Sequence, residues 1–182
     1  MSATGGEDGP AAETGRAAGL LSVRPAEPGD AEAVAHVHTR CWQQTYRGIL
    51  SDGFLDALDP AGRLGMWQRI VGGPRLADHW VACDGGTVVG FAGRQHPGAE
   101  GQLPLPVRPV MLWGLYLLES HQGLGLGRRL LESAVGDEPA SLWVAAENSR
   151  AVEFYRHFGF ELDGADEVMA EWENLREVRM LR

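Results

Sequence analysis

The chain has 182 residues, of which 44% are hydrophobic and 23% are charged, and its formal net charge is −9. This size and composition suit one globular domain, and the acidic charge disfavours a nucleic-acid partner, which needs a basic face. No apolar run approaches the roughly 20 residues of a membrane span, and the run at 17–21 is too short for a secretion signal. Cys41 and Cys83 lack the spacing of a zinc site or disulfide framework. We therefore expect a cytoplasmic protein with neither a membrane partner nor a bound metal.

The first 19 residues are rich in glycine, alanine and glutamate and show no apolar periodicity. Such a segment cannot bury enough surface to order itself. We predict a disordered tail over residues 1–19 and a single domain over residues 20–182.

The N-terminal part of the domain carries mainly helical patterns. A short strand at 21–24 ends at Pro25, and Asp30 is expected to cap a helix that runs from 31 to about 40. The stretch Cys41–Leu50, CWQQTYRGIL, then connects to helices at 51–58 and 62–71. From residue 80 the apolar period becomes two, which predicts a hairpin of strands at 80–83 and 87–93.

The middle of the chain predicts the centre of a sheet. A proline-rich loop at 95–109 precedes the strand 110–118, VMLWGLYLL, which is apolar on both faces and is interrupted by Gly114. A glycine there marks a bulge or a close approach of backbone and ligand. A helix to about residue 135 and a strand at 141–145 follow, which predicts a parallel strand pair.

The C-terminal part begins with Asn148, which is placed to cap a helix whose apolar positions recur at helical spacing. Gly159 ends this helix. The last two strands are predicted at 160–162 and 175–181, joined by a long irregular turn.

The segment HQGLGLGRRLL, His121–Leu131, places three glycines where a helix begins. Exposed N–H groups and the positive end of the helix dipole make such a loop a phosphate site. A nucleotide-binding loop of the Walker type needs a lysine and a hydroxyl that are absent here, and the dinucleotide fingerprint needs a third glycine where Arg128 or Leu130 stands.

The pattern Q-x-x-G-x-G, from Gln122 to Gly127, resembles the pyrophosphate loop of the GNAT superfamily of N-acetyltransferases. A second segment, from Asn148 to Phe160, is similar to the N-x-x-A-x-x-F-Y-x-x-x-G-F helix of that family. The two together are specific, and the resemblance extends over about residues 20–182.

This resemblance implies an α/β (α+β) fold with a mixed, mostly antiparallel sheet of six to seven strands flanked by helices. One parallel strand pair splays apart in such a fold, and the gap holds the pantetheine arm of acetyl-coenzyme A, the co-substrate. The resemblance further implies a primary amine acceptor, in a small molecule or a protein, and is compatible with a homodimer.

The resemblance also implies roles for individual residues. The backbone of the central strand would contact the acetyl and pantetheine groups, through Leu115, Tyr116 and Leu117. The pyrophosphate would lie against Gln122, Gly123, Leu124, Gly125, Leu126, Gly127 and Arg128, with Arg129 as an alternative to Arg128. Asn148 would contact the cofactor arm, and Tyr155 would lie near the sulfur as the candidate acid.

The acceptor side is less determined. In CWQQTYRGIL, Trp42 and Tyr46 are candidate substrate-binding residues, and the loop at 95–109 is a candidate second wall. Some family members carry a basic carboxylate in the strand before the motif asparagine, but here 141–147 contains no acidic residue before Glu147. Glu119, His121 and a water chain remain alternative proton acceptors.

Structural roles compete with these assignments. Tyr155 follows the apolar stripe of its helix and also suits a core tyrosine, Asn148 suits a helix cap, and Trp42 suits a loop anchor. We predict an N-acetyltransferase that works by direct attack of the amine on acetyl-coenzyme A. A non-catalytic, acyl-coenzyme A-binding regulatory module of the same fold is the alternative, which the missing strand carboxylate favours.

Overall fold

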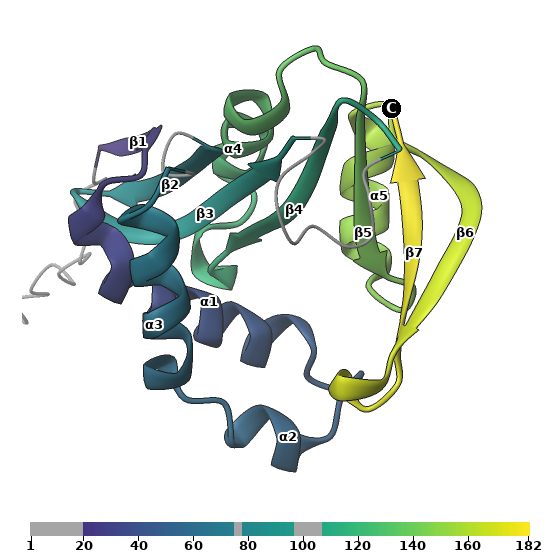
Figure 1. The fold of residues 1–182 in the computed structure, drawn as a ribbon, viewed down its shortest axis with the longest axis horizontal. Helices are drawn as coiled ribbons and strands as arrows, with labels where there is room; N and C mark the ends of the chain where they lie inside the picture. The colour runs from purple at the N-terminus through teal and green to yellow at the C-terminus, as the bar shows by residue number, and fades with distance from the viewer. Residues whose placement is uncertain (1–19, 75–77, 97–106) are drawn as a thin grey trace, which may run out of the picture.

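The computed structural model in Figure 1 describes residues 20–74, 78–96 and 107–182. The predicted tail at 1–19 and most of the predicted loop at 95–109 lie outside these ranges. Described helices pack on both faces of a seven-stranded sheet with strand order β1-β2-β3-β4-β5-β7-β6. The strands are β1 Leu21–Pro25, β2 His79–Asp84, β3 Thr87–Gln95, β4 Val110–Leu117, β5 Ala140–Ala145, β6 Glu161–Met169 and β7 Leu175–Leu181.

Every neighbouring pair in the sheet is antiparallel except β4 and β5. These two strands pair in parallel only from Val110 opposite Ala140 to Leu112 opposite Leu142. Beyond that point β4 and β5 diverge, which Figure 1 shows at the centre of the molecule. The predicted mixed sheet with one splayed parallel pair is therefore confirmed.

The divergence coincides with a bulge in β4. Gly93 of β3 lies opposite Gly114, while Arg94 lies opposite Leu112, so Trp113 is an extra residue on the β4 side. A bulge increases the local twist and bends the strand that carries it. The irregularity that Gly114 predicted is confirmed, one residue before the glycine.

The helices are α1 Ala31–Thr45, α2 Asp52–Asp56, α3 Pro60–Val71, α4 Leu126–Val135 and α5 Ser149–His157. One buried cluster joins α1 and α3 to β2 and β3. A second cluster joins α4 and α5 to the opposite face of the sheet. A third connects the C-terminal end of α1 and the short α2 to β5 and β7.

Two predicted boundaries are wrong. Helix α1 does not end near residue 40 but continues to Thr45, because Cys41 and Trp42 extend the apolar face that Val34 and His38 begin, and all four side chains are buried. Strand β6 does not end at Leu162 but runs to Met169. Its pairing with β7 is interrupted between Leu162 and Asp166, which hides the strand period in the sequence.

The predicted capping role of Asp30 is also wrong. Its carboxylate accepts hydrogen bonds from the Arg24 guanidinium at 2.7 and 2.8 Å and from the Glu27 N–H at 2.7 Å. The side chain therefore stabilises the 3₁₀ turn η1 (Pro28–Asp30) and links it to β1, and it makes no capping hydrogen bond to α1.

His38 is buried where α1 and α3 meet the sheet. The indole of Trp67 donates to its Nδ1 at 3.2 Å, and Nη1 of Arg63 lies 3.0 Å from its Nε2. Burial, and next the positive charge of Arg63, lower the pKa of His38 from 6.5 to about 2. The imidazole is therefore neutral in the folded protein at every pH at which the protein would normally be studied.

This neutral histidine predicts a pH dependence of stability. Below about pH 6.5 the histidine takes up a proton in the unfolded state but not in the folded state, so the unfolding free energy decreases as the pH falls below that value. We expect His38→Gln to remove about 2 kcal/mol of the decrease in unfolding free energy between pH 7 and pH 5. Urea unfolding of both proteins at the two pH values measures this, and equal pH dependence in both would contradict the assignment.

Candidate functional site

A cavity of about 650 Å³ lies where β4 and β5 part. Residues from β4, β5, β7, α5, the glycine segment and the end of α1 surround it, which brings together segments far apart in the sequence. The predicted site residues in its lining are Tyr46, Leu115, Tyr116, Leu117, Gln122, Gly123, Gly125, Gly127, Arg128, Asn148 and Tyr155. Of the remaining predicted residues, Leu124 is exposed, whereas Leu126 and Trp42 are buried in hydrophobic clusters.

The glycine segment forms an open cradle at one end of the cavity. Gly123 and Gly125 have φ angles of +76° and +81°, and a Cβ atom at either position would project into empty space. Gly125 also precedes the first residue of α4, whose first N–H groups have no partner within the helix. Gly127 serves packing, since a Cβ there would lie 3.4 Å from the ring of Phe154.

Gln122 connects this loop to the central strand. Its Nε2 donates to the Leu117 carbonyl at 3.0 Å, while its Oε1 is buried and has no hydrogen-bond partner among the described residues. A buried acceptor without a donor is unfavourable, so Oε1 has an unmet demand that an N–H or O–H group of a ligand in the cavity would satisfy.

The two arginines after the glycines have different surroundings. Arg128 lines the cavity, and its exposed guanidinium pairs with Glu132 at 2.6 Å. Arg129 instead donates to the Leu21 carbonyl of β1 at 2.9 Å and is not part of the lining. A further arginine, Arg150 in the first turn of α5, also lines the cavity, and sequence reasoning missed it.

Asn148 combines the two roles that the sequence left open. Its Oδ1 accepts the Ala151 N–H at 3.1 Å, which confirms the predicted helix cap, and the residue also lines the cavity.

Three tyrosines from three elements line the interior of the cavity, namely Tyr46 after α1, Tyr116 in β4 and Tyr155 in α5. Burial is the main cause that raises the pKa of each phenol above its ordinary value. The neighbouring Tyr116 raises the pKa of Tyr155 further. These hydroxyls therefore stay protonated and serve as hydrogen-bond donors at neutral pH.

One carboxylate of the lining was missed by sequence reasoning. Glu177 of β7 lies opposite Ala145 of β5, and its side chain is half-buried. Burial, and next the negative charges of Glu167 and Glu171, raise its pKa to about 7. The strand sequence LREVRML places Glu177 next to Arg176 and does not alternate regularly between polar and apolar residues, so no local pattern singled out this glutamate.

Of the two side chains predicted as alternative proton acceptors, Glu119 lines the cavity and His121 does not. Glu119 is exposed and lines the cavity. His121 is buried outside the lining, with its Nδ1 2.9 Å from the Ser120 hydroxyl and its Nε2 3.2 Å from the Asp84 carboxylate. His121 thus links the 3₁₀ turn η3 (Glu119–His121) to β2 rather than facing the cavity.

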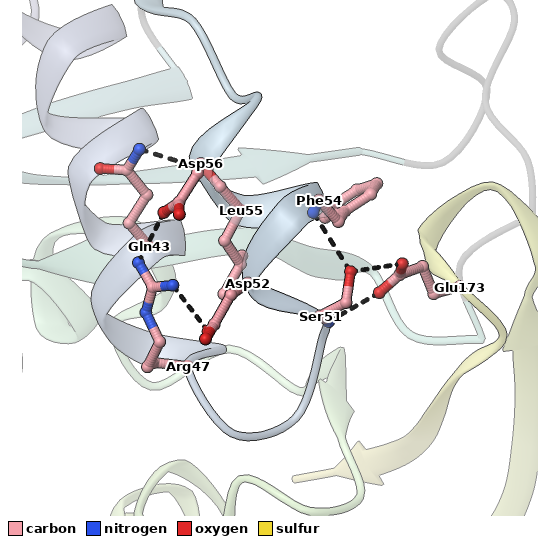
Figure 2. A network of polar contacts seen from close by, with 8 residues as sticks. All are labelled: Gln43, Arg47, Ser51, Asp52, Phe54, Leu55, Asp56 and Glu173. Atoms are coloured by element: carbon pink, nitrogen blue, oxygen red, sulfur yellow. Dashed lines mark hydrogen bonds and ion pairs between the residues drawn. The ribbon is translucent and has the colours of Figure 1, made fainter.

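Two segments far apart in the sequence, residues 46–56 and the β6–β7 turn, meet beside the cavity residues Tyr46 and Trp172. The Glu173 carboxylate accepts the Ser51 N–H and the Ser51 hydroxyl, both at 2.7 Å. Figure 2 shows this contact next to the Arg47 guanidinium, which pairs with Asp52 at 2.7 Å and with Asp56 at 3.0 Å.

Aromatic rings pack behind these polar contacts. The ring centroid of Trp42 lies 4.9 Å from that of Tyr46 and 5.0 Å from that of Trp172. Tyr46 and Trp172 line the cavity, whereas Trp42 supports them from the core.

Comparisons with known proteins agree with this architecture. Residues 75–162 match the family model described as an acetyltransferase (GNAT) domain. The probable N-acetyltransferase Rv2775 of Mycobacterium tuberculosis is 30% identical over 79% of this chain and 82% of its own length. A tRNA-acetylating toxin of the same organism is 33% identical over 54% of this chain and 68% of its own length. The chain therefore belongs to the GNAT family of acetyltransferases.

A solved structure shares the fold. The PaiA N-acetyltransferase of Thermoplasma acidophilum, crystallised in complex with coenzyme A, aligns with a TM-score of 0.64 and 20% identity. The alignment covers 87% of this chain and 97% of that protein. Among the described residues no helix is long and apolar enough to cross a membrane.

The Glu173–Ser51 contact predicts that the wall formed by residues 46–56 and the β6–β7 turn is protected from amide hydrogen exchange. We expect Glu173→Ala to increase amide hydrogen exchange at Ser51 and Phe54 by about tenfold or more, because both N–H groups depend on this contact directly or through the Ser51 hydroxyl. Glu171→Ala, on the same turn, is the matched control and should leave these amides unchanged. Equal exchange in both variants would show that the contact does not hold the wall together.

Proposed function

We propose that this protein transfers an acetyl group from acetyl-coenzyme A to a primary amine by direct attack of the amine nitrogen. One observation carries the proposal: a single cavity joins an open glycine cradle at a helix N-terminus to a cluster of buried phenols between two diverging strands. The cradle suits the coenzyme diphosphate, and the gap suits the narrow pantetheine arm.

The residues present fit this co-substrate. The N–H groups around Gly125 and the guanidinium of Arg128 would bind the diphosphate. Beyond Leu112 the β4 edge has no β5 partner, so its backbone groups are open to the amides of the pantetheine arm. The unpartnered Oε1 of Gln122 offers an additional acceptor to the same arm.

The chemistry needs charge stabilisation at two atoms. When the amine nitrogen attacks the thioester, negative charge develops on the carbonyl oxygen, and a strand N–H placed there in advance contributes about 3 kcal/mol. When the carbon–sulfur bond breaks, the negative charge moves to the sulfur. Coenzyme A supplies the activated acetyl group and this leaving thiolate.

Tyr155 is our candidate for stabilising the sulfur. Proton transfer from a phenol to a thiolate is uphill by about 1.5 pKa units in water, and burial of the phenol does not reduce this gap unless the thiolate is desolvated as well. We therefore assign to Tyr155 a hydrogen bond that strengthens as the sulfur becomes negative, with the proton following once the thiolate lies in the apolar cavity.

The acceptor is proposed only as a primary amine of a small molecule or protein. One relative acts on tRNA by its name, but the net charge of −9 in this chain disfavours a polyanionic acceptor. The missing carboxylate of β5, which favoured the regulatory alternative, has a candidate substitute, because Glu177 lies opposite Ala145 and lines the cavity.

A calorimetric titration followed by an amine screen tests this function. We expect saturable binding of acetyl-coenzyme A, thiol release that depends on an added amine, and a mass increase of one acetyl group on that amine. No saturable heat at millimolar co-substrate would reject the proposal. Binding without transfer to any member of a panel of small amines, amino acids and peptides would favour the regulatory module.

Gly125→Ala tests the cradle. An added methyl group at φ +81° is strained and projects into the space proposed for the diphosphate, so we expect the Kd for coenzyme A to increase about tenfold or more. Gly86→Ala is the matched control, because Gly86 also has a positive φ, +91°, and open space around its Cβ, but lies in the β2–β3 turn. If both substitutions change the Kd equally, the cradle is not the diphosphate site.

Tyr155→Phe tests the role at the sulfur. We expect kcat to fall by about 10- to 100-fold while the Kd for coenzyme A changes less than twofold, since the hydroxyl acts mainly as charge develops. Steady-state kinetics and calorimetry measure the two quantities. Equal losses in both would indicate a structural tyrosine.

A further inference from the structure

Glu177 is one of two carboxylates in the cavity lining, and it lies on a strand of the sheet. It is paired across the sheet with Ala145, at the end of β5 where that strand has left β4. Glu177, Tyr46 and Tyr116 line the same cavity, and the negative charge of Glu177 raises the pKa of both phenols. The other carboxylate of the lining, Glu119, lies outside the strands, in the 3₁₀ turn η3.

The charges that act on Glu177 are negative, and the cation Arg63 of α3, which acts on Tyr46 and Tyr116, contacts His38 and the ring of Trp42 instead. Glu167 of β6 lies directly across from Glu177, and Glu171 of the 3₁₀ turn η4 (Ala170–Trp172) adds a second negative charge. Arg179, two residues along β7, is paired with Asp163 at 2.7 Å and stacks over Trp143. Among the described residues no cationic side chain forms an ion pair with Glu177.

The remaining walls around Glu177 suit an organic cation. Tyr46, Tyr116 and Trp172 line the same cavity, and aromatic faces attract ammonium groups. A half-buried carboxylate that shares a cavity with aromatic rings and has the like charges of Glu167 and Glu171 beside it is unfavourable, and an ammonium ion next to it would relieve this cost.

We propose that Glu177 binds the ammonium group of the acceptor and accepts the proton that its nitrogen loses before attack. This inference rests on the proposed acetyl transfer and adds to it the protonation state of the acceptor and the group that changes it. The acceptor enters as a cation and becomes nucleophilic only inside the cavity.

The step balances in protons and electrons. The ammonium nitrogen transfers one proton to the Glu177 carboxylate, and the lone pair so freed forms the carbon–nitrogen bond. The carbon–sulfur bond breaks, and the thiolate receives the second nitrogen proton, directly or through Tyr155. The neutral carboxyl of Glu177 then releases its proton to solvent, which restores the enzyme.

The surroundings of Glu177 make this transfer less unfavourable. A free glutamate lies about six pKa units below an alkylammonium ion such as that of lysine, and Glu177 before the acceptor binds, with a pKa of about 7, lies only about three units below it. The positive charge of a bound ammonium ion lowers the pKa of Glu177 from this value, while Glu167 and Glu171 continue to oppose that decrease. A base whose pKa is near the working pH is also half-ionised there, so it both accepts and releases protons readily.

Glu177→Gln with a pH–rate profile tests the inference, using an amine that the wild-type protein acetylates. For the wild type we expect kcat/KM to increase with pH through about 7, because the carboxylate must be ionised to accept the proton. The Gln variant should lack this rise and should be slower at pH 8 by about 100-fold or more, while its Kd for coenzyme A stays unchanged.

Glu167→Gln is the matched control. It removes a like charge from the position across from Glu177 without touching the cavity lining, so the midpoint of the rise should shift to lower pH while the plateau is preserved. A purely structural role of Glu177 would not move this midpoint.

These measurements distinguish a failure of the role proposed for Glu177 from a failure of the proposed acetyl transfer. If Glu177→Gln retains the wild-type kcat/KM and the rise near pH 7, the role of Glu177 is wrong and the acetyl transfer stands. If only the rise persists while the rate falls, another group accepts the proton, which also overturns the inference. If the wild-type protein binds acetyl-coenzyme A and acetylates no amine, the proposed function itself fails.

Discussion

The site depends on the short pairing of β4 with β5. Only three residue pairs, ending at Leu112 opposite Leu142, hold the two halves of the sheet together at this point. The bulge at Trp113 then bends β4, while β5 keeps its partner β7 as far as Ala145 opposite Glu177. A sheet that continued its ladder would leave no cavity and would satisfy the β4 edge internally. The interrupted ladder therefore produces both the space and the open backbone groups.

The cavity has ends of opposite electrical character. Helix α4 presents unpartnered N–H groups at one end, next to the guanidinium of Arg128. At the other end the half-buried carboxylate of Glu177 lies among phenols, with Glu167 and Glu171 behind it. The proposed function would direct an anionic co-substrate and a cationic acceptor to these different ends. The contact between Glu173 and Ser51 lies beside the end that contains Tyr46 and Trp172.

The sequence predicted the fold, the glycine loop at the start of α4 and the cap of α5, because these depend on local patterns. Strand periodicity, Gly125 before a helix and Asn148 as a cap are properties of neighbouring residues, and the structure confirms each of these features. The end of the cavity that contains Glu177 is formed by contacts between segments that lie far apart in the sequence, so local patterns did not predict it. Glu177 enters the cavity through its pairing with Ala145, and the Ser51–Glu173 contact spans 122 residues.

Contacts with distant residues also decide two details that local sequence did not predict, the end of α1 and the different positions of Arg128 and Arg129. The end of α1 lies beyond its predicted position because Cys41 and Trp42 become part of the buried face only through contacts with distant segments. Cys41 packs in the cluster with α3, β2 and β3, and Trp42 packs in the cluster with α2, β5 and β7. Arg129 is indistinguishable from Arg128 in sequence, and only its contact with the Leu21 carbonyl separates them.

A crystal structure of the protein with coenzyme A tests the central claim most directly. The account predicts the diphosphate against the segment 122–128, the pantetheine arm between β4 and β5, and the sulfur next to Tyr155, with Glu177 facing the sulfur across the remaining space. A structure in which the coenzyme lies outside this gap, or in which β4 and β5 pair beyond Leu112, would contradict it.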